Sequence, residues 1–259
     1  MALPKLTQLE LEAALRRVGV QPGDGLLVHS ALQFLGRPEG GVAIYLAALL
    51  NVLGPSGTIA VPTFNFAFTR GEEYDPAATP SEGMGVLSEL VRSHPQARRT
   101  SHPMQSLAVL GAQAEALAAL DTPSAFDDGS AFDRMLALDF KLLLFGADIQ
   151  AASIVHYSEQ RAAVPYRYWK QFTGRVREDG DWEQRSYRMF VRDLQADPQL
   201  DLAPVQAQLE AKGQWHSERL NYGALSLCSL QDFVAAADAL LAEDKWALVG
   251  NKSEALARR

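Results

Sequence analysis

The stretch Gly25-Leu26-Leu27-Val28-His29-Ser30 decides the fold, because it is a short apolar run that stops at two polar residues. Apolar runs of this length, bounded by turn residues, are typical of buried strands. Gln21-Pro22-Gly23-Asp24 is a turn cluster before the run, and Ser30 is placed to cap a second segment over residues 31–35. Sites in layered α/β proteins lie where strands end, so His29 and Ser30 mark a candidate active-site edge.

Helix and strand patterns alternate around this strand. Thr7-Gln8-Leu9-Glu10 is a capping box, which predicts a helix from about Leu9 to Val18. Apolar patterns predict further helices at 42–53, 85–92 and 112–120, and further strands at 57–62, 106–110 and 141–146. This order predicts an α/β fold, layered α/β/α, with a mainly parallel or mixed central sheet.

The last third of the chain has a different composition. Residues 164–176 are rich in Tyr, Trp and Phe and predict strands, whereas 203–211 and 229–243 predict helices. The sequence shows no internal repeat and no clear linker. We therefore expect one domain over residues 1–259, with a core up to about residue 167 and a C-terminal elaboration over about 168–259.

Composition excludes several classes of protein. The chain has 259 residues, 47% of them hydrophobic and 21% charged, with a net charge of −7. It has no dense basic tract, which argues against a nucleic-acid partner, and no apolar run long enough to cross a membrane. The N-terminus is not a secretory signal, and the single cysteine, Cys228, fits a reducing cytoplasm. We expect a cytoplasmic enzyme; its oligomeric state, with a homodimer as one option, stays open.

Four groups of motifs carry a resemblance to a known family. They are Val28-His29-Ser30-Ala31-Leu32 with Gly40-Gly41; Leu53-Gly54-Pro55-Ser56-Gly57-Thr58 with Val61-Pro62-Thr63-Phe64; Asp75-Pro76 and Thr79-Pro80-Ser81 with Arg99-Thr100-Ser101-His102-Pro103 and Ser106; and Leu144-Phe145-Gly146 with His156, Glu159, Arg161 and Pro165-Tyr166. In this order and spacing, across residues 25–167, the chain resembles the antibiotic N-acetyltransferase family, named after aminoglycoside 3-N-acetylation.

The resemblance implies an acetyl-CoA-dependent enzyme that acetylates a primary amine of an aminoglycoside or amino sugar. One departure concerns residues 121–124, Asp-Thr-Pro-Ser, where many resistance enzymes of the family carry a histidine. The C-terminal third, with Phe190-Val191-Arg192-Asp193-Leu194, looks more like relatives that acetylate amino sugars in biosynthesis. A biosynthetic N-acyltransferase acting on another small amine is therefore the alternative. The sequence also leaves open whether the acyl group is acetyl or longer.

Acetylation of an amine needs a base, because an ammonium ion cannot attack a thioester until it loses a proton. The Ser-His-Pro motif makes His102 the candidate catalytic base, since histidine titrates in the right range. Glu159 is the candidate carboxylate that orients the imidazole. His156 and Glu159 are three residues apart, so they share a face if that segment is helical.

The remaining candidate residues concern binding. The resemblance favours coenzyme A contacts at His29, Ser30, Ala31, Leu32, Thr63 and Ser106. Free backbone N–H groups at a helix start after Ser30 would suit a phosphate. For the amine substrate the candidates are Asp75, His156 and Tyr166, and the aromatic stretch 166–172 could stack on sugar rings.

Three other classes of function have weaker support in the sequence. A Ser/His hydrolase would use Ser30 or Ser106 as nucleophile, but neither serine lies in a Gly-x-Ser-x-Gly elbow. A metal enzyme would need His29, His102 and His156 to converge, and no His-Glu-x-x-His motif or cysteine cluster supports it, so no metal is expected. A non-enzymatic small-molecule regulator is disfavoured by the presence of both His102 and Glu159.

Overall fold

The computed structural model describes residues 4–178 and 180–258 and is built on a mixed sheet of seven strands, in the order β10-β11-β7-β2-β4-β6-β5. The three central strands run parallel and are β2 (Gly25–Ser30), β4 (Thr58–Pro62) and β7 (Lys141–Phe145). The outer strands pair antiparallel to their neighbours and are β5 (Arg98–Arg99), β6 (Leu107–Gly111), β10 (His216–Leu220) and β11 (Gly223–Ser229). The parallel centre brings the ends of β2, β4 and β7 to one edge of the sheet.

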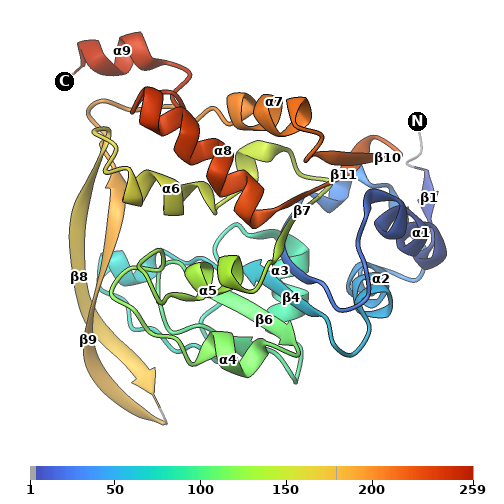
Figure 1. Ribbon diagram of the computed structural model, residues 1–259. Helices are drawn as coiled ribbons and strands as arrows, with labels where there is room; N and C mark the ends of the chain where they lie inside the picture. Colours follow the sequence, from blue (N-terminus) through green and yellow to red (C-terminus); the bar gives the residue numbers. More distant parts are fainter. Residues whose placement is uncertain (1–3, 179, 259) are drawn as a thin grey trace.

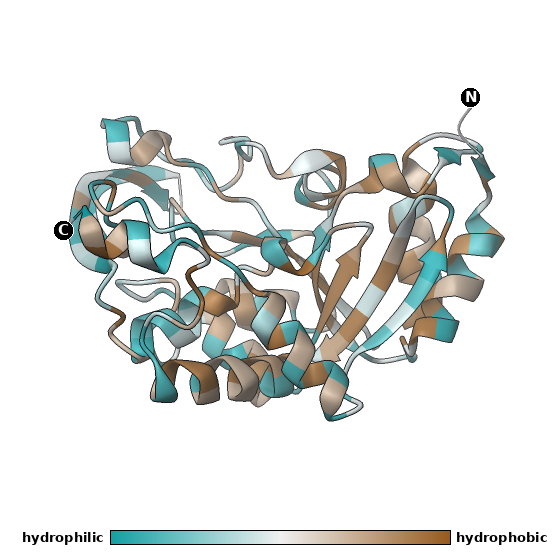
Figure 2. Cartoon of the chain, turned by 90° about the horizontal axis from the view of Figure 1, so that it is seen from above, coloured by the Kyte–Doolittle hydropathy of each residue, from teal (hydrophilic) through white to brown (hydrophobic). Residues whose placement is uncertain are grey.

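Helices cover both faces of the sheet (Figure 1). Side chains alternate along each strand, so Leu26 and Val28 of β2 enter one core while Leu27 enters the other. The first core is covered by α1 (Gln8–Val18), α2 (Ala43–Leu53) and α3 (Gly85–Arg92). The second is covered by α4 (Ala114–Ala118), α5 (Ala131–Ala137), α6 (Val155–Arg161), α7 (Ala203–Ala211) and α8 (Leu230–Glu243). The predicted α/β/α layering is confirmed, and Figure 2 shows apolar residues gathered on the central strands.

A long two-stranded hairpin stands outside the central sheet. It consists of β8 (Arg167–Glu178) and β9 (Asp181–Arg192), and it runs down the left side of Figure 1. Val176 and Tyr187 on its inner face pack with Phe68, Tyr74 and Met104 in a small third core. The hairpin is thereby fixed against the loops that follow β4 and β5.

Short elements connect these layers. They are β1 (Lys5–Leu6), β3 (Arg37–Pro38), the 3-10 turns η1 (Leu32–Phe34), η2 (Ala67–Arg70) and η3 (Ile149–Ala151), and the terminal helix α9 (Lys252–Ala257). The expected segment at 31–35 is therefore a 3-10 turn and not an α-helix. The chain beyond residue 167 also supplies β10 and β11, so both sides of that expected boundary contribute to one sheet.

Candidate active site

The edge where β2, β4 and β7 end is hollowed by a cavity of about 300 Å³, here called the inner cavity. His29 and Ser30 reach it from β2, Pro62 from β4, and Ser153 and His156 from the segment around α6. Sheets of this kind place ligands at the carboxyl ends of their parallel strands. His29 and Ser30, which the sequence marks as candidates, therefore lie at this edge.

His156 and Glu159 form a close side-chain contact at this edge. Both lie on α6, one turn apart, and His156 Nδ1 is 2.5 Å from Glu159 Oε2. The His156 side chain is 28% exposed, whereas Glu159 is fully buried. One ring nitrogen is thus held by a carboxylate while the ring edge faces open space, which is how general-base histidines are oriented.

Arg167, the first residue of β8, contacts the same carboxylate. Its Nε lies 2.9 Å from Glu159 Oε2, and its side chain is 13% exposed. Burial alone would raise the pKa of Glu159, but His156 and Arg167 together hold that pKa below its usual value. Glu159 is therefore a buried carboxylate kept ionised by two partners.

His29 faces His156 across the inner cavity and is a neutral group. Its Nε2 accepts a hydrogen bond from the backbone N–H of Ser153 at 3.3 Å. Burial, with a smaller contribution from His156, lowers the pKa of His29 to about 3. The ring therefore serves as a fixed, uncharged wall of the cavity.

His102 is not part of this cluster. Its Nδ1 accepts from the backbone N–H of Gln105 at 3.1 Å, and its Nε2 lies 3.4 Å from the backbone oxygen of Arg188. The residue is only 5% exposed, and burial lowers its pKa to about 4. The sequence paired His102 with Glu159, whereas in the structure the partner of Glu159 is His156.

Thr63 and Ser106 lie inside the protein. Ser106 Oγ donates to the backbone oxygen of Thr63 at 3.0 Å, and the Nε of Arg99 donates to the hydroxyls of both residues. Both side chains are fully buried. Their hydroxyls bond within the protein, so the structure does not bring these two candidates to the coenzyme A edge.

The candidates Ala31 and Leu32 come directly after β2, beside a large open groove of about 880 Å³, here called the outer groove. Ala31 lines it together with Ser30, Trp215, Arg219 and other residues, whereas Leu32 packs partly buried against the first core. The backbone N–H of Ala31 donates to the oxygen of Phe145, so it is not a free donor for a phosphate. Ser30 and Ala151 line both the outer groove and the inner cavity, so the two hollows are neighbours.

Gly146 explains how the chain passes this junction. It follows β7 with a φ of +78°, and a Cβ at this position would lie 2.6 Å from the backbone oxygen of Ala31. The positive φ and the close approach both require glycine. The Leu144-Phe145-Gly146 motif therefore shapes the floor of the outer groove.

On the other side of His156 lies a smaller cavity of about 160 Å³, here called the hairpin-base cavity. Two arginines, Arg167 and Arg192, line it besides His156, and its other walls include Phe66 and Phe190. Tyr166 does not reach it: the ring is buried, packs on Trp246 with centroids 5.1 Å apart, and lies beside Glu159. Burial, together with Glu159, raises the pKa of Tyr166, so the phenol stays neutral.

The aromatic stretch 166–172 divides between inside and outside. Trp169 is exposed, and the guanidinium of Arg188 stacks on its ring at 4.4 Å from the centroid. One face of the indole is therefore already covered by a cation.

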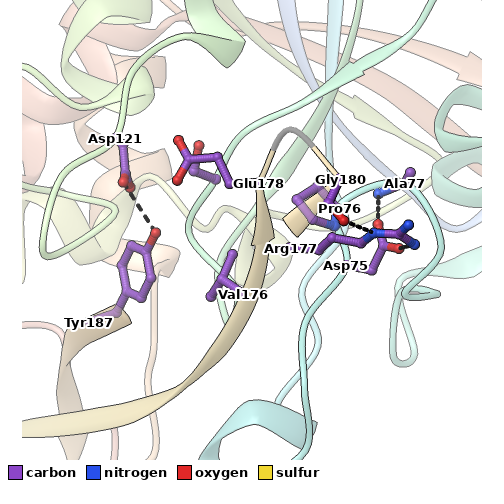
Figure 3. Close-up of a pocket in the computed structure, with 10 residues that line it drawn as sticks. Asp75, Pro76, Ala77, Asp121, Val176, Arg177, Glu178, Gly180 and Tyr187 are labelled. Carbon is purple, nitrogen blue, oxygen red and sulfur yellow. Dashed lines mark hydrogen bonds and ion pairs between the residues drawn. The ribbon is translucent and has the colours of Figure 1, made fainter. Parts of the chain in front are cut away.

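Asp75 lies in a separate cavity of about 450 Å³ at the tip of the hairpin, shown in Figure 3. Its carboxylate accepts from the N–H of Ala77 at 2.8 Å and pairs with Arg177 at 3.1 Å. Across the cavity the hydroxyl of Tyr187 donates to Asp121 at 3.2 Å. Tyr187 and not His156 lines this cavity, so Asp75 and His156 belong to different hollows of the molecule.

Within residues 4–178 and 180–258, no helix is long and apolar enough to cross a membrane. Over the same ranges, no group of three or more His, Cys, Asp or Glu side chains is placed to hold a metal ion. His29, His102 and His156 do not converge on a common point in this part of the chain.

Comparison with known proteins identifies the class. The family model for aminoglycoside 3-N-acetyltransferase matches residues 27–242, and the chain belongs to this family. The resemblance noted in the sequence is thereby confirmed. Aminoglycoside N(3)-acetyltransferase III of Salmonella sp is 33% identical over 181 residues, which are 63% of this chain and 63% of that relative.

Solved structures show the same fold. Aminoglycoside acetyltransferase AAC(3)-Xa superposes with a TM-score of 0.83 at 26% identity, over 92% of this chain and 93% of that one. The binary complex of AAC-IIIb with CoASH superposes with a TM-score of 0.82 over 93% of this chain and 97% of that one. Because the identity is only 23%, the second comparison shows a shared fold and nothing more.

Proposed function

We propose that this protein transfers an acetyl group from acetyl-CoA to a primary amine, with His156 as the general base and Glu159 as the carboxylate that orients it. One observation carries the proposal: His156 Nδ1 lies 2.5 Å from buried Glu159, and its ring lies between the inner cavity and the hairpin-base cavity. A base at such a junction can meet an amine from one side and a thioester from the other. The family and the names of the relatives support the reaction type.

His156 fits the role of base better than His102, the base expected from the sequence. Both ring nitrogens of His102 lie within hydrogen-bonding distance of main-chain groups, so binding a proton there would break a native interaction. His156 engages Glu159 through Nδ1, and its Nε2 makes no hydrogen bond to a described residue. A base has to reach the proton it removes, and only His156 of the two is open to a cavity of useful size.

The reaction assigned to these residues balances without a metal. The amine nitrogen attacks the thioester carbonyl carbon, and His156 Nε2 takes the proton that this nitrogen releases. Glu159 stabilises the resulting imidazolium. When the tetrahedral intermediate collapses, the carbon–sulfur bond breaks, and His156 returns the proton to the leaving thiolate.

Acetyl-CoA fits the two neighbouring hollows on the β2 side of His156. The inner cavity is narrow and could receive the thioester arm, while the outer groove is wide and open. Arg219 and Ser217 on β10 line the groove and offer donors for phosphate oxygens. Because the reaction consumes acetyl-CoA, we place the protein in the cytoplasm, where acetyl-CoA is held.

The test is a matched pair of variants. Purified protein is incubated with acetyl-CoA and a panel of amines, and the release of free thiol is followed. His156→Gln should lower kcat by roughly 10²–10⁴-fold, the usual worth of a positioned base. His102→Gln, assayed where it is folded, should lose less than about tenfold. If His102→Gln loses the rate and His156→Gln keeps it, His102 is the base.

An aminoglycoside or amino-sugar amine is the acceptor that the family supports. A second acceptor class is favoured by the hairpin-base cavity, because two arginines, Arg167 and Arg192, line it besides His156, and no carboxylate of the described residues does. Such a wall suits a small amine that also carries an anionic group better than a polycation. Comparing kcat/KM for an aminoglycoside with that for an amino acid amide and a phosphorylated amino sugar decides between the two.

A further inference from the structure

Two side chains lie close to the same oxygen, Oε2 of Glu159. His156 Nδ1 lies 2.5 Å from it and Arg167 Nε lies 2.9 Å from it. Arg167 begins β8 directly after the loop from α6, and its Nη1 also donates to the backbone oxygen of Phe190 on β9 at 3.3 Å. The arginine is therefore fixed to the hairpin with its Nε beside the carboxylate (Figure 1 shows α6 ending beside β8).

A buried carboxylate has two opposite effects on a neighbouring imidazole. It orients the ring through a hydrogen bond, which helps a base, but its charge also favours the imidazolium, which cannot accept another proton. Opposite charges within about 4–6 Å shift such equilibria by about 1–3 pH units. At a fully buried Glu159, screening by water is weak, so the unwanted effect would be strong.

We propose that Arg167 is a positioning residue for the reaction: it shares Glu159 Oε2 with His156, so that the carboxylate orients the ring without holding it as an imidazolium. The cation offsets the carboxylate charge while the hydrogen bond to Nδ1 remains. This inference rests on the proposed role of His156 and adds to it the group that offsets the carboxylate charge beside the base.

The other groups that face His156 do not supply this charge. His29 on β2 is neutral because burial lowers its pKa to about 3. Tyr166, behind Glu159, is also neutral, and Phe126 meets the His156 ring edge-on with centroids 5.7 Å apart. Arg192 on β9 lines the same cavity, but it pairs with Asp197 at 3.7 Å. Arg192 is therefore a matched control, since it has the same charge and cavity but a different partner.

The test compares Arg167→Gln with Arg192→Gln through the pH profile of kcat/KM. Arg167→Gln should move the acidic limb to higher pH by about one unit or more, because the His156–Glu159 pair then takes up a proton more readily, whichever site carries it. Arg192→Gln should leave the limb in place, and Arg167→Lys, which keeps the charge, should restore most of it. The profile is measured with two acceptors of different amine pKa. A limb that comes from the enzyme stays at the same pH with both acceptors, whereas one that comes from the substrate moves with the amine.

A second readout does not depend on activity. Nuclear magnetic resonance of labelled histidine rings, assigned with His156→Gln, follows the titration of this ring directly. Glu159→Gln should move the titration to lower pH, because the charge of Arg167 is then unopposed, and Glu159→Gln with Arg167→Gln should move it back. This double variant buries no unpaired charge, so it gives a folded comparison if Arg167→Gln alone does not fold.

The outcomes separate the two proposals. Equal rate loss at every pH, with no movement of the limb or of the ring titration in Arg167→Gln, would show that Arg167 is only structural and overturn the inference. Full activity of His156→Gln would instead overturn the proposed base. In that case the ring titration still decides whether Arg167 sets the charge of the His156–Glu159 pair.

Discussion

The ring of Tyr187 meets the ring of His102 edge-on, with their centroids 5.1 Å apart, inside the contact between β9 and the loop after β5. Tyr187 belongs to the hairpin and His102 to the loop, so this pair fastens one to the other. The backbone oxygen of Arg188, the next residue of β9, lies 3.4 Å from His102 Nε2. His102 is thus placed to hold the hairpin that carries Arg167 and Arg192.

The first prediction follows from this contact and concerns stability. His102→Ala removes a buried ring and leaves the N–H of Gln105 and the oxygen of Arg188 without their partner. Losses of this kind cost about 2–4 kcal/mol in the free energy of unfolding, which urea denaturation measures. His102→Gln, which can both donate and accept, should cost less. Unchanged stability of His102→Ala together with a 10²-fold rate loss would return His102 to the role of base.

The second prediction concerns the pH dependence of folding. Burial lowers the pKa of His29 to about 3 and that of His102 to about 4, from an ordinary value of 6.5. Below pH 6.5 these two histidines therefore bind protons in the unfolded chain but stay neutral in the folded one. The two neutral histidines therefore add to the free energy of unfolding. Their contribution is fully present above pH 6.5 and is lost as the pH falls, toward about 4 for His102 and toward about 3 for His29.

The melting temperature, measured from pH 7.5 down to 4.5, should therefore stay level to about pH 6.5 and fall over the window from there to pH 4.5. Each histidine contributes a slope of about 1.4 kcal/mol per pH unit in this window. His102→Gln should flatten the curve by its share, because glutamine binds no proton. The same slope in the wild type and in His102→Gln would mean that other groups, such as paired carboxylates, cause the loss.

The third prediction concerns metals. Acetyl transfer by a histidine base needs no Lewis acid, and within residues 4–178 and 180–258 no cluster of metal-binding side chains is present. Extended treatment with EDTA should leave kcat within about twofold of the untreated enzyme, an expectation that rests on base catalysis alone. Loss of activity that zinc restores would favour a metal mechanism instead.

The layers of the fold could be predicted from the sequence better than the contacts between side chains in the candidate site. Leu26, Leu27 and Val28 sit in an apolar run whose pattern is local, so β2 could be predicted, as could the helix that Thr7 and Glu10 cap. The strands β10 and β11 were missed, because their short, partly polar patterns gain stability only by pairing with β7.

The pairing of side chains depends on contacts that span many residues. The spacing of His156 and Glu159 indicated one shared helix face, and the structure has α6 at that place. Nothing local to His102 indicated that Gln105 and Arg188 would engage its ring, since Arg188 is 86 residues away along the chain. Arg167 was missed as well, although a cation placed just after a His-x-x-Glu helix was a signal that could have found it.

The fourth prediction concerns the route of acetyl-CoA. Ser30 is where the inner cavity and the outer groove meet, so a large side chain there should block the thioester arm. At ligand about a hundred times the dissociation constant, binding to the folded state adds about 2.7 kcal/mol, so wild-type protein should show a clear rise in melting temperature with CoA. Ser30→Trp should abolish that rise while the protein without ligand stays folded, because the residue is only partly buried at the end of β2.

Ala77→Trp in the hairpin-tip cavity is the control, since it adds the same bulk to a hollow that Ser30 does not line. If Ser30→Trp binds CoA as the wild type does, or if Ala77→Trp is the variant that loses binding, the two neighbouring hollows do not hold the cofactor.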